Sequence, residues 1–186
     1  MKRRLILCAW LIVPAMPLAG VAASLPSQDH LASDYANLPV SFEANTGQAD
    51  PAIQFVAHGQ GGNLLLTSSE AWLTLQNGGD EEAPCSLRLK FAGANPSPQV
   101  EGLGPLPGKA NYLIGSDSSR WRTDVPTFAR IKYHEVYPGV DLIYYGNQQK
   151  LEYDLVVQPG ADPNDILLEF SGAEKINLDA SGDLLL

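Results

Sequence analysis

The chain has 186 residues with 12 basic and 21 acidic side chains, which gives a formal net charge of −9 at pH 7. A field of this sign repels phosphate backbones and anionic lipid surfaces, so it excludes nucleic acid and a directly bound membrane as expected partners. The chain contains 2 cysteines. Cys8 lies in an N-terminal apolar run, so we expect the exported chain to keep Cys85 alone and to form no internal disulfide.

The N-terminus has the composition of a signal peptide. Residues 2–4 are all lysine or arginine, residues 5–13 form an apolar run, and the small residues 19–23 offer a cleavage site before Ser24. The run is too short to span a bilayer, and a retained anchor helix is the alternative. We therefore expect residues 1–23 to direct export to the periplasm, the cell surface or the exterior. Cleavage would leave 9 basic against 21 acidic residues, a net charge of −12.

Residues 24–37 are small, polar and aperiodic, which is typical of a flexible arm. Over 38–186, short apolar runs rich in β-branched and aromatic residues alternate with Gly, Pro, Asn and Asp. This pattern predicts an all-β domain, a β-sandwich-like fold of antiparallel sheets with short strands and many turns. The expected strands are 53–57, 63–68, 70–76, 86–92, 110–115, 127–136, 140–145, 150–157, 166–170, 175–179 and 183–186.

A proline-rich stretch interrupts this pattern. Residues 93–108 contain Pro96, Pro98, Pro105 and Pro107. Proline and glycine in such numbers predict either a long irregular connection or a boundary between two halves of the domain.

One hairpin can be predicted in more detail. A two-residue turn at 146–147 places Asp141 opposite Glu152, whereas a four-residue loop over 146–149 places it opposite Asp154. Both registers keep the same side chains on each face, and the apolar face is expected to join the core. That face holds Leu142, Tyr144, Leu151, Tyr153 and Leu155, and the other face holds Asp141, Ile143, Tyr145, Glu152 and Asp154.

The carboxylates of this hairpin are candidates for chemistry. Asp141, Glu152 and Asp154 could hold Ca²⁺, a hard cation that prefers oxygen ligands. Two carboxyl groups a few ångströms apart are also what the hydrolysis of a polysaccharide requires. The simpler interpretation is a solvated sheet face whose charge is relieved by Lys132, Lys150 or Arg130. We expect this solvated face, and we expect no cofactor.

Aromatic rings are the second candidate feature. Trp72, Trp121 and Tyr145 are candidates for glycan contact, because β-domains bind sugars by stacking rings on apolar sugar faces while acids take the hydroxyls. Packing of these rings in the core is the alternative.

No other pattern in the sequence indicates catalysis. His58 and His134 have no second metal-type ligand at a hairpin or helical spacing. The sequence has no Gly-x-Ser-x-Gly motif, and Cys85 follows an acidic run that disfavours a reactive thiolate. We therefore predict no catalytic residues and a protein that is not an enzyme.

Several segments of the chain together carry a family resemblance. The segments are FEANTGQ (42–48), LPGKANYLIG (106–115), WRTDVP (121–126), VYPGVDLIYYG (136–146), LEYD (151–154) and PGADP (159–163). In combination they resemble the N-terminal region of bacterial SBBP-repeat proteins, which are large exported proteins, and the resemblance covers nearly the whole chain from Leu38. In that family this region precedes seven-bladed β-propeller repeats, and the resemblance implies no activity or catalytic residue.

The C-terminal residues predict a hairpin with an exposed apolar end. Residues 175–179 and 183–186 would pair through the turn 180–182, and the second strand would form a short edge of the sheet. Side chains alternate between faces, so at least one leucine of 184–186 is expected to meet solvent. Such an edge predicts self-association, which Leu185→Lys would reduce if Leu185 is the exposed residue and Leu184→Lys would reduce otherwise.

The expected function follows from export, the all-β pattern and the resemblance. We expect a non-enzymatic, extracytoplasmic structural or interaction module of a larger cell-surface or secreted protein. Its expected partners are downstream β-propeller repeats, surface glycans or proteins, and the chain looks truncated before the repeats. A carbohydrate-binding domain or a polysaccharide hydrolase is the alternative.

Overall fold

The computed structural model describes residues 4–5, 40–59, 62–75, 85–147 and 150–185. Apart from Arg4 and Leu5, the predicted signal peptide and the predicted arm lie outside the described residues, as does Leu186. The described residues form strands and turns with two short 3-10 segments, η1 (Ser118–Arg120) and η2 (Pro163–Asp165). The expected all-β class is therefore confirmed.

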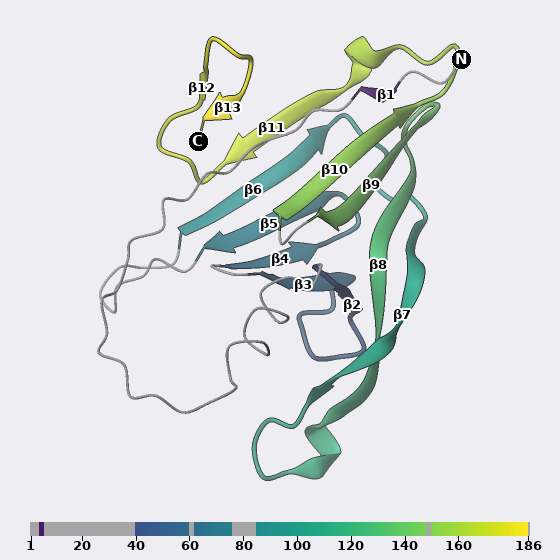
Figure 1. Cartoon of the computed structure of the whole chain (residues 1–186), viewed down its shortest axis with the longest axis vertical. Helices are drawn as coiled ribbons and strands as arrows, with labels where there is room; N and C mark the ends of the chain where they lie inside the picture. Colours follow the sequence, from purple (N-terminus) through teal and green to yellow (C-terminus); the bar gives the residue numbers. More distant parts are fainter. Residues whose placement is uncertain (1–3, 6–39, 60–61, 76–84, 148–149, 186) are drawn as a thin grey trace, which may run out of the picture.

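Among the described residues, eleven strands form one antiparallel sheet, and two further strands pair separately (Figure 1). In the large sheet the hydrogen-bonded order is β1-β10-β9-β8-β2-β3-β4-β5-β6-β11, with β7 paired to β8. The strands are β1 (Arg4–Leu5), β2 (Phe42–Ala44), β3 (Phe55–Gly59), β4 (Gly62–Leu66), β5 (Glu70–Leu75), β6 (Cys85–Ala92), β7 (Val100–Tyr112), β8 (Arg122–Tyr137), β9 (Val140–Asn147), β10 (Lys150–Val157), β11 (Leu167–Ser171), β12 (Asn177–Leu178) and β13 (Leu184–Leu185).

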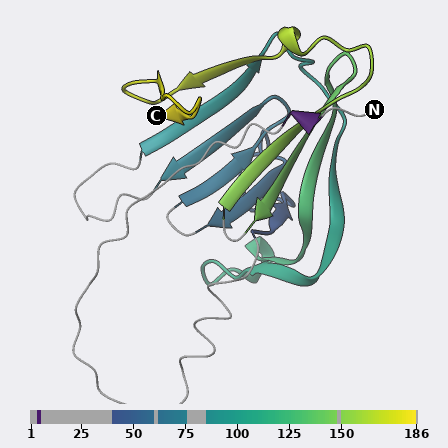
Figure 2. The ribbon, with the colours of Figure 1, turned by 45° about the horizontal axis from the view of Figure 1, so that its top comes forward.

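The long strand β8 connects the two parts of the sheet. One edge of β8 is followed by β7, and the other edge is shared by β2 at residues 127–128 and by β9 at residues 130–133. The sheet therefore curls, and β3 to β6 come to face β8 to β10 (Figure 2). We refer to these two parts as the β3–β6 wall and the β8–β10 wall.

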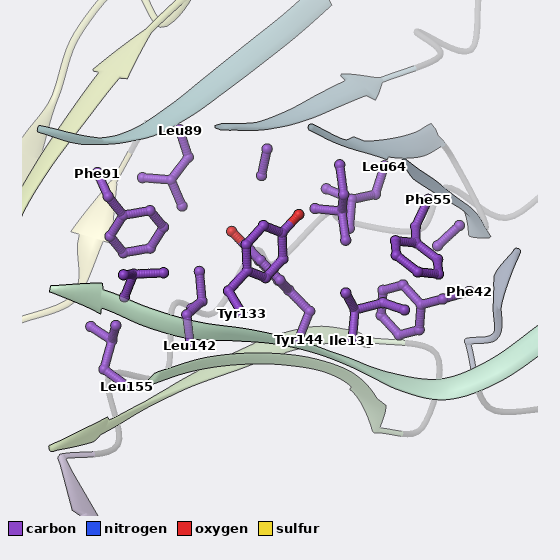
Figure 3. Close-up of a cluster of buried hydrophobic side chains, with 14 of the residues drawn as sticks. Phe42, Phe55, Leu64, Leu89, Phe91, Ile131, Tyr133, Leu142, Tyr144 and Leu155 are labelled. Carbon is purple, nitrogen blue, oxygen red and sulfur yellow. The ribbon is translucent and has the colours of Figure 1, made fainter. Parts of the chain in front are cut away.

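The core lies between the two walls (Figure 3). Leu64, Leu66 and Leu89 point into it from one wall, and Ile131 and Leu142 from the other. Burying each such side chain contributes about 1.5–3 kcal/mol. Two buried tyrosines satisfy their hydroxyls across the core, since the Tyr133 hydroxyl donates to the Thr67 carbonyl at 2.6 Å and that of Tyr137 donates to the Ala92 carbonyl at 2.7 Å.

The proline-rich stretch is not a long irregular connection, which was one of its two predicted interpretations. Only its first part, 93–99, is irregular, and β7 begins at Val100 and pairs along β8. Proline is tolerated because β7 lies at an edge of the sheet. It pairs with β8 on one side, and on its other side no strand that the structure describes needs a backbone N–H donor. The pairing shifts register between Pro105 and Lys109.

The β9–β10 hairpin confirms the predicted faces but has neither predicted register. Asn147 pairs with Lys150, which places Asp141 opposite Val156. Gly146 therefore belongs to β9 and not to the turn. A Cβ at Gly146 would lie 2.8 Å from the Val40 backbone nitrogen, so the glycine serves a close approach of another segment. The observed partner of Asp141, Val156, differs from the two predicted partners, Glu152 and Asp154, by an even number of residues. The same side chains therefore share each face of the hairpin as predicted.

The C-terminal hairpin forms as predicted, with Leu178 opposite Leu184 and Asn177 opposite Leu185. It is a separate two-stranded sheet, so the expectation that its second strand ends the main sheet is wrong. The Asp179 carboxylate organises the turn by accepting from the backbone amides of Ser181 and Asp183. Leu185 is the exposed leucine of the pair in β13, whereas Leu184 is half-buried.

Candidate functional site

The outer face of the β3–β6 wall carries two clusters of polar side chains. Side chains alternate along a strand, so residues next to the core positions of β5 and β6 point away from the core. The pairing of these strands places Trp72 beside Arg88 and, one row along, Glu70 beside Lys90. We name the group Glu70, Trp72 and Arg88 the Trp72 cluster.

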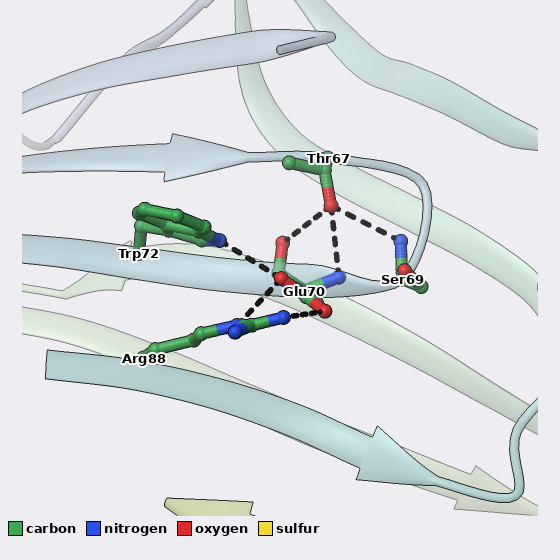
Figure 4. Close-up of polar contacts among 5 residues, drawn as sticks. All are labelled: Thr67, Ser69, Glu70, Trp72 and Arg88. Atoms are coloured by element: carbon green, nitrogen blue, oxygen red, sulfur yellow. Dashed lines mark hydrogen bonds and ion pairs between the residues drawn. The ribbon is translucent and has the colours of Figure 1, made fainter. Parts of the chain in front are cut away.

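Glu70 is the centre of the Trp72 cluster (Figure 4). Its carboxylate accepts a hydrogen bond from Arg88 Nε at 2.7 Å and a second contact from the terminal guanidinium nitrogen. The Trp72 indole Nε1 donates to the same carboxylate at 3.0 Å. The Arg88 guanidinium carbon lies 5.4 Å from the centre of the Trp72 ring, a cation–π distance. The Thr67 hydroxyl accepts from the Glu70 backbone amide at 3.0 Å and so fixes the turn that leads into β5.

These contacts set both the charge and the orientation of the cluster. The Arg88 hydrogen bonds hold the pKa of Glu70 below its ordinary value, so the pair is ionised and mutually neutralised. The polar edge of the Trp72 indole is bound to Glu70, which fixes the ring, yet 39% of the residue stays exposed. The result is a fixed apolar surface with polar groups beside it, which is the arrangement that stacking on a sugar ring requires.

The other two aromatic candidates lie elsewhere. Trp121 lies just before β8, at the tip of the β7–β8 hairpin, and its Nε1 donates to the Gly115 carbonyl at 3.1 Å. Tyr145 lies on the outer face of the β8–β10 wall, with its hydroxyl 3.0 Å from Asp154 and Arg130 over its ring. The two walls face each other across the core, so the outer faces that carry Trp72 and Tyr145 point in different directions. The three rings do not form one surface.

Asp141 has a structural role at an irregularity of β8. Its Oδ1 accepts from the Glu135 amide at 2.9 Å, and its Oδ2 lies 3.1 Å from the Lys132 ammonium. Glu135 has φ 48°, and the β8–β9 pairing shifts register between Tyr133 and Tyr137. Burial favours the neutral acid, but the Glu135 amide and Lys132 outweigh it and hold the pKa of Asp141 below its ordinary value. Asp141 thus accepts from the backbone at the irregularity of β8. It also pairs with Lys132, one of the cations expected to balance the negative charge of this face.

The candidate group of three carboxylates, Asp141, Glu152 and Asp154, does not converge on one point. Glu152 stands opposite Tyr145 and accepts from the side-chain amide of Asn147 at 3.1 Å, while Asp154 stands opposite Ile143 and accepts from the Tyr145 hydroxyl. Within the ranges that the structure describes, no three His, Cys, Asp or Glu side chains lie close enough together to hold a metal ion.

Asp141→Asn is expected to destabilise the fold by about 2 kcal/mol at neutral pH, because a partly buried charged contact is lost. The folded state lowers the pKa of the carboxylate, so its contribution is present above the ordinary value of 3.8 and is lost as the pH falls through the lowered value. Urea unfolding at about pH 7 and about pH 3 should show the gap between wild type and variant shrinking in acid. Glu152→Gln, which keeps an acceptor for Asn147, is the control, and a gap that widens in acid contradicts the role.

The second cluster on the outer face, which we name the Tyr112 cluster, was not predicted. The Tyr112 hydroxyl donates to Glu43 of β2 and lies 3.1 Å from His58 Nε2 of β3. His58 Nδ1 lies 2.7 Å from the Asn63 side-chain oxygen of β4. Burial and the Glu43 carboxylate raise the pKa of Tyr112 well above its ordinary value, which suits a hydrogen-bond donor and not a nucleophile. The Tyr112 cluster therefore links the end of β7 to β2 and β3.

Little in the sequence could have indicated this second cluster. Tyr112 is 69 residues from Glu43 and 54 from His58, so no local spacing brings them together. The contact depends on where the end of β7 lies relative to β2 and β3, which is a property of the whole sheet. The Trp72 cluster has a local signal, because Glu70 and Trp72 alternate on one strand and point to the same side.

The fold and these clusters define an all-β domain with fixed polar groups on the outer face of one wall. A family model described as Domain of unknown function (DUF7948) matches residues 42–186, and the chain belongs to this family. No curated protein and no solved structure matches the chain. Neither of the two short helical segments among the described residues has the length and apolar character needed to cross a membrane.

Proposed function

We propose that the chain is a non-enzymatic interaction domain that works outside the cytoplasm as part of a larger exported protein. The signal-peptide pattern of residues 1–23 and the resemblance to the N-terminal region of SBBP-repeat proteins support this proposal. In such a protein, β-propeller repeats would be the neighbours of the domain within the polypeptide.

The observation that carries a specific ligand class is the Trp72 cluster. A fixed and partly exposed indole on a sheet face binds the apolar side of a sugar ring at low entropic cost, because the ring is already held by Glu70 and Arg88. Thr74 lies two residues along the same strand, and Lys90 stands opposite Glu70. These groups provide donors and acceptors for sugar hydroxyls. The proposed ligand is therefore a surface or extracellular glycan.

A glycan array tests this proposal with wild type, Trp72→Ala and Trp121→Ala. We expect wild-type binding that Trp72→Ala weakens about tenfold or more, since the loss of a stacking ring is worth roughly 1.4 kcal/mol or more. Trp121→Ala removes an equally exposed tryptophan from the hairpin tip and should leave binding unchanged. Absence of any glycan signal from the wild type removes the proposed ligand class, and equal loss in both variants removes the role of Trp72.

A further inference from the structure

The tip of the β7–β8 hairpin presents apolar side chains away from the body of the molecule. Leu113 and Ile114 are 57% and 75% exposed, and Trp121 is exposed beside them. Figure 1 shows this tip at the bottom of the view, beyond the ends of the other strands. The segment 113–122 has Arg120 and Arg122 against Asp117, so it is locally basic in an acidic chain.

The tip is held rigidly. The Asp117 carboxylate accepts from the Ser119 amide at 3.0 Å and from its hydroxyl at 2.7 Å, which caps η1. The Trp121 amide donates to the Ser118 carbonyl, and its indole donates to Gly115. Arg122 packs over Gly47 and donates to the Trp121 carbonyl at 3.1 Å. A surface ordered in advance loses little conformational entropy on binding.

The C-terminal hairpin carries a second apolar surface of opposite charge. Leu178 is 73% exposed, and Ile176 and Leu185 are also exposed. The segment 174–185 has three acidic residues, Glu174, Asp179 and Asp183, against Lys175. This hairpin lies near the top of the view in Figure 1, at the end of the molecule opposite to the β7–β8 tip.

We infer that the β7–β8 tip docks on the C-terminal hairpin of a second copy of this chain. Both surfaces are apolar, and their charges are complementary, which favours contact between them over contact of either surface with itself. They lie at opposite ends of one molecule, so a single chain cannot bring them together. The contact is therefore heterologous, and repetition joins copies head to tail. Few side chains take part at each end, so each contact is weak and requires high protein concentration.

Two variants with one altered end each test this inference by multi-angle light scattering. The mass of the purified wild type should rise with concentration from the monomer value toward about twice that value or more, and added salt should reduce the rise. Ile114→Asp at the tip and Leu178→Lys at the hairpin should each remain monomeric alone. An equimolar mixture of the two should associate again, because each variant supplies the end that the other lacks. Glu152→Gln, in the β9–β10 hairpin and at neither end, should associate like the wild type.

Three results would overturn the inference. A wild type that stays monomeric at high concentration shows that the ends do not bind. Association of Ile114→Asp alone assigns the contact to a symmetric pairing of two C-terminal hairpins. Sedimentation of a monomeric wild type with phosphatidylglycerol vesicles, lost in Ile114→Asp, assigns the tip to a lipid surface.

Discussion

Gly172→Ala is expected to destabilise the fold by about 3 kcal/mol more than the same change at Gly160. Both glycines have φ +95°, a conformation that costs a residue with a Cβ about 1–3 kcal/mol. A Cβ at Gly160 meets no atom within 4 Å, whereas a Cβ at Gly172 would lie 2.0 Å from the Ser86 carbonyl oxygen. The backbone of β6 cannot yield as a flexible side chain would, so β11 must separate from it at this end.

The matched pair of variants isolates that clash from the cost of the positive φ. Urea unfolding gives the free energy of unfolding of each variant, and hydrogen exchange reports the amides that pair β11 with β6. We expect faster exchange in these amides for Gly172→Ala and unchanged exchange there for Gly160→Ala. Equal destabilisation by the two substitutions would show that the β6–β11 contact tolerates the extra carbon.

Asn45→Asp is expected to destabilise the fold by about 3 kcal/mol at neutral pH. The side-chain nitrogen of Asn45 donates to the backbone carbonyls of Asp50 at 2.8 Å and Ile53 at 2.7 Å, and more weakly to that of Ala49. Its oxygen accepts from the amides of Gly47 and Ala49. One side chain thus organises the connection between β2 and β3. The substitution keeps the acceptor but turns a second oxygen toward backbone carbonyls, which repel it.

The sign of the pH dependence separates this effect from a general loss of packing. Protonation lets the introduced carboxyl group donate to one carbonyl, so the variant should recover stability relative to wild type as the pH falls through the carboxyl range. Gln48→Glu is the control in the same loop, because Gln48 donates one hydrogen bond, to the Ala44 carbonyl at 2.7 Å. It should lose about 1 kcal/mol. Urea unfolding at several pH values gives the free energy of unfolding of both variants. A loss of stability in Asn45→Asp no larger than in Gln48→Glu would contradict the organising role of Asn45.

The alternation of apolar and polar residues determined the fold class and the faces of the strands. Leu142, Tyr144 and Leu155 are buried, as the period of two requires, whichever register the hairpin adopts. The same period places Glu70 and Trp72 on one side of β5, so half of the Trp72 cluster was readable locally. Turn composition likewise predicted the β12–β13 hairpin, because the Asp179 side chain satisfies the turn by itself.

Only the tertiary structure decided the register of β9 and β10, the strand through the prolines and the Tyr112 cluster. From the sequence alone, Gly146 is predicted to be a turn residue. In the structure it lies within β9, and it must be glycine because Val40 packs where a Cβ would be. From the sequence alone, Pro105 is predicted to interrupt a strand. The structure accommodates it within β7, because β7 lies at an edge of the sheet. Tyr112, Glu43 and His58 come from three strands that are far apart in the sequence and meet only in the folded sheet. Sequence patterns report which side of a strand is apolar, whereas these features depend on which segments approach one another, and that is settled by packing of the whole sheet.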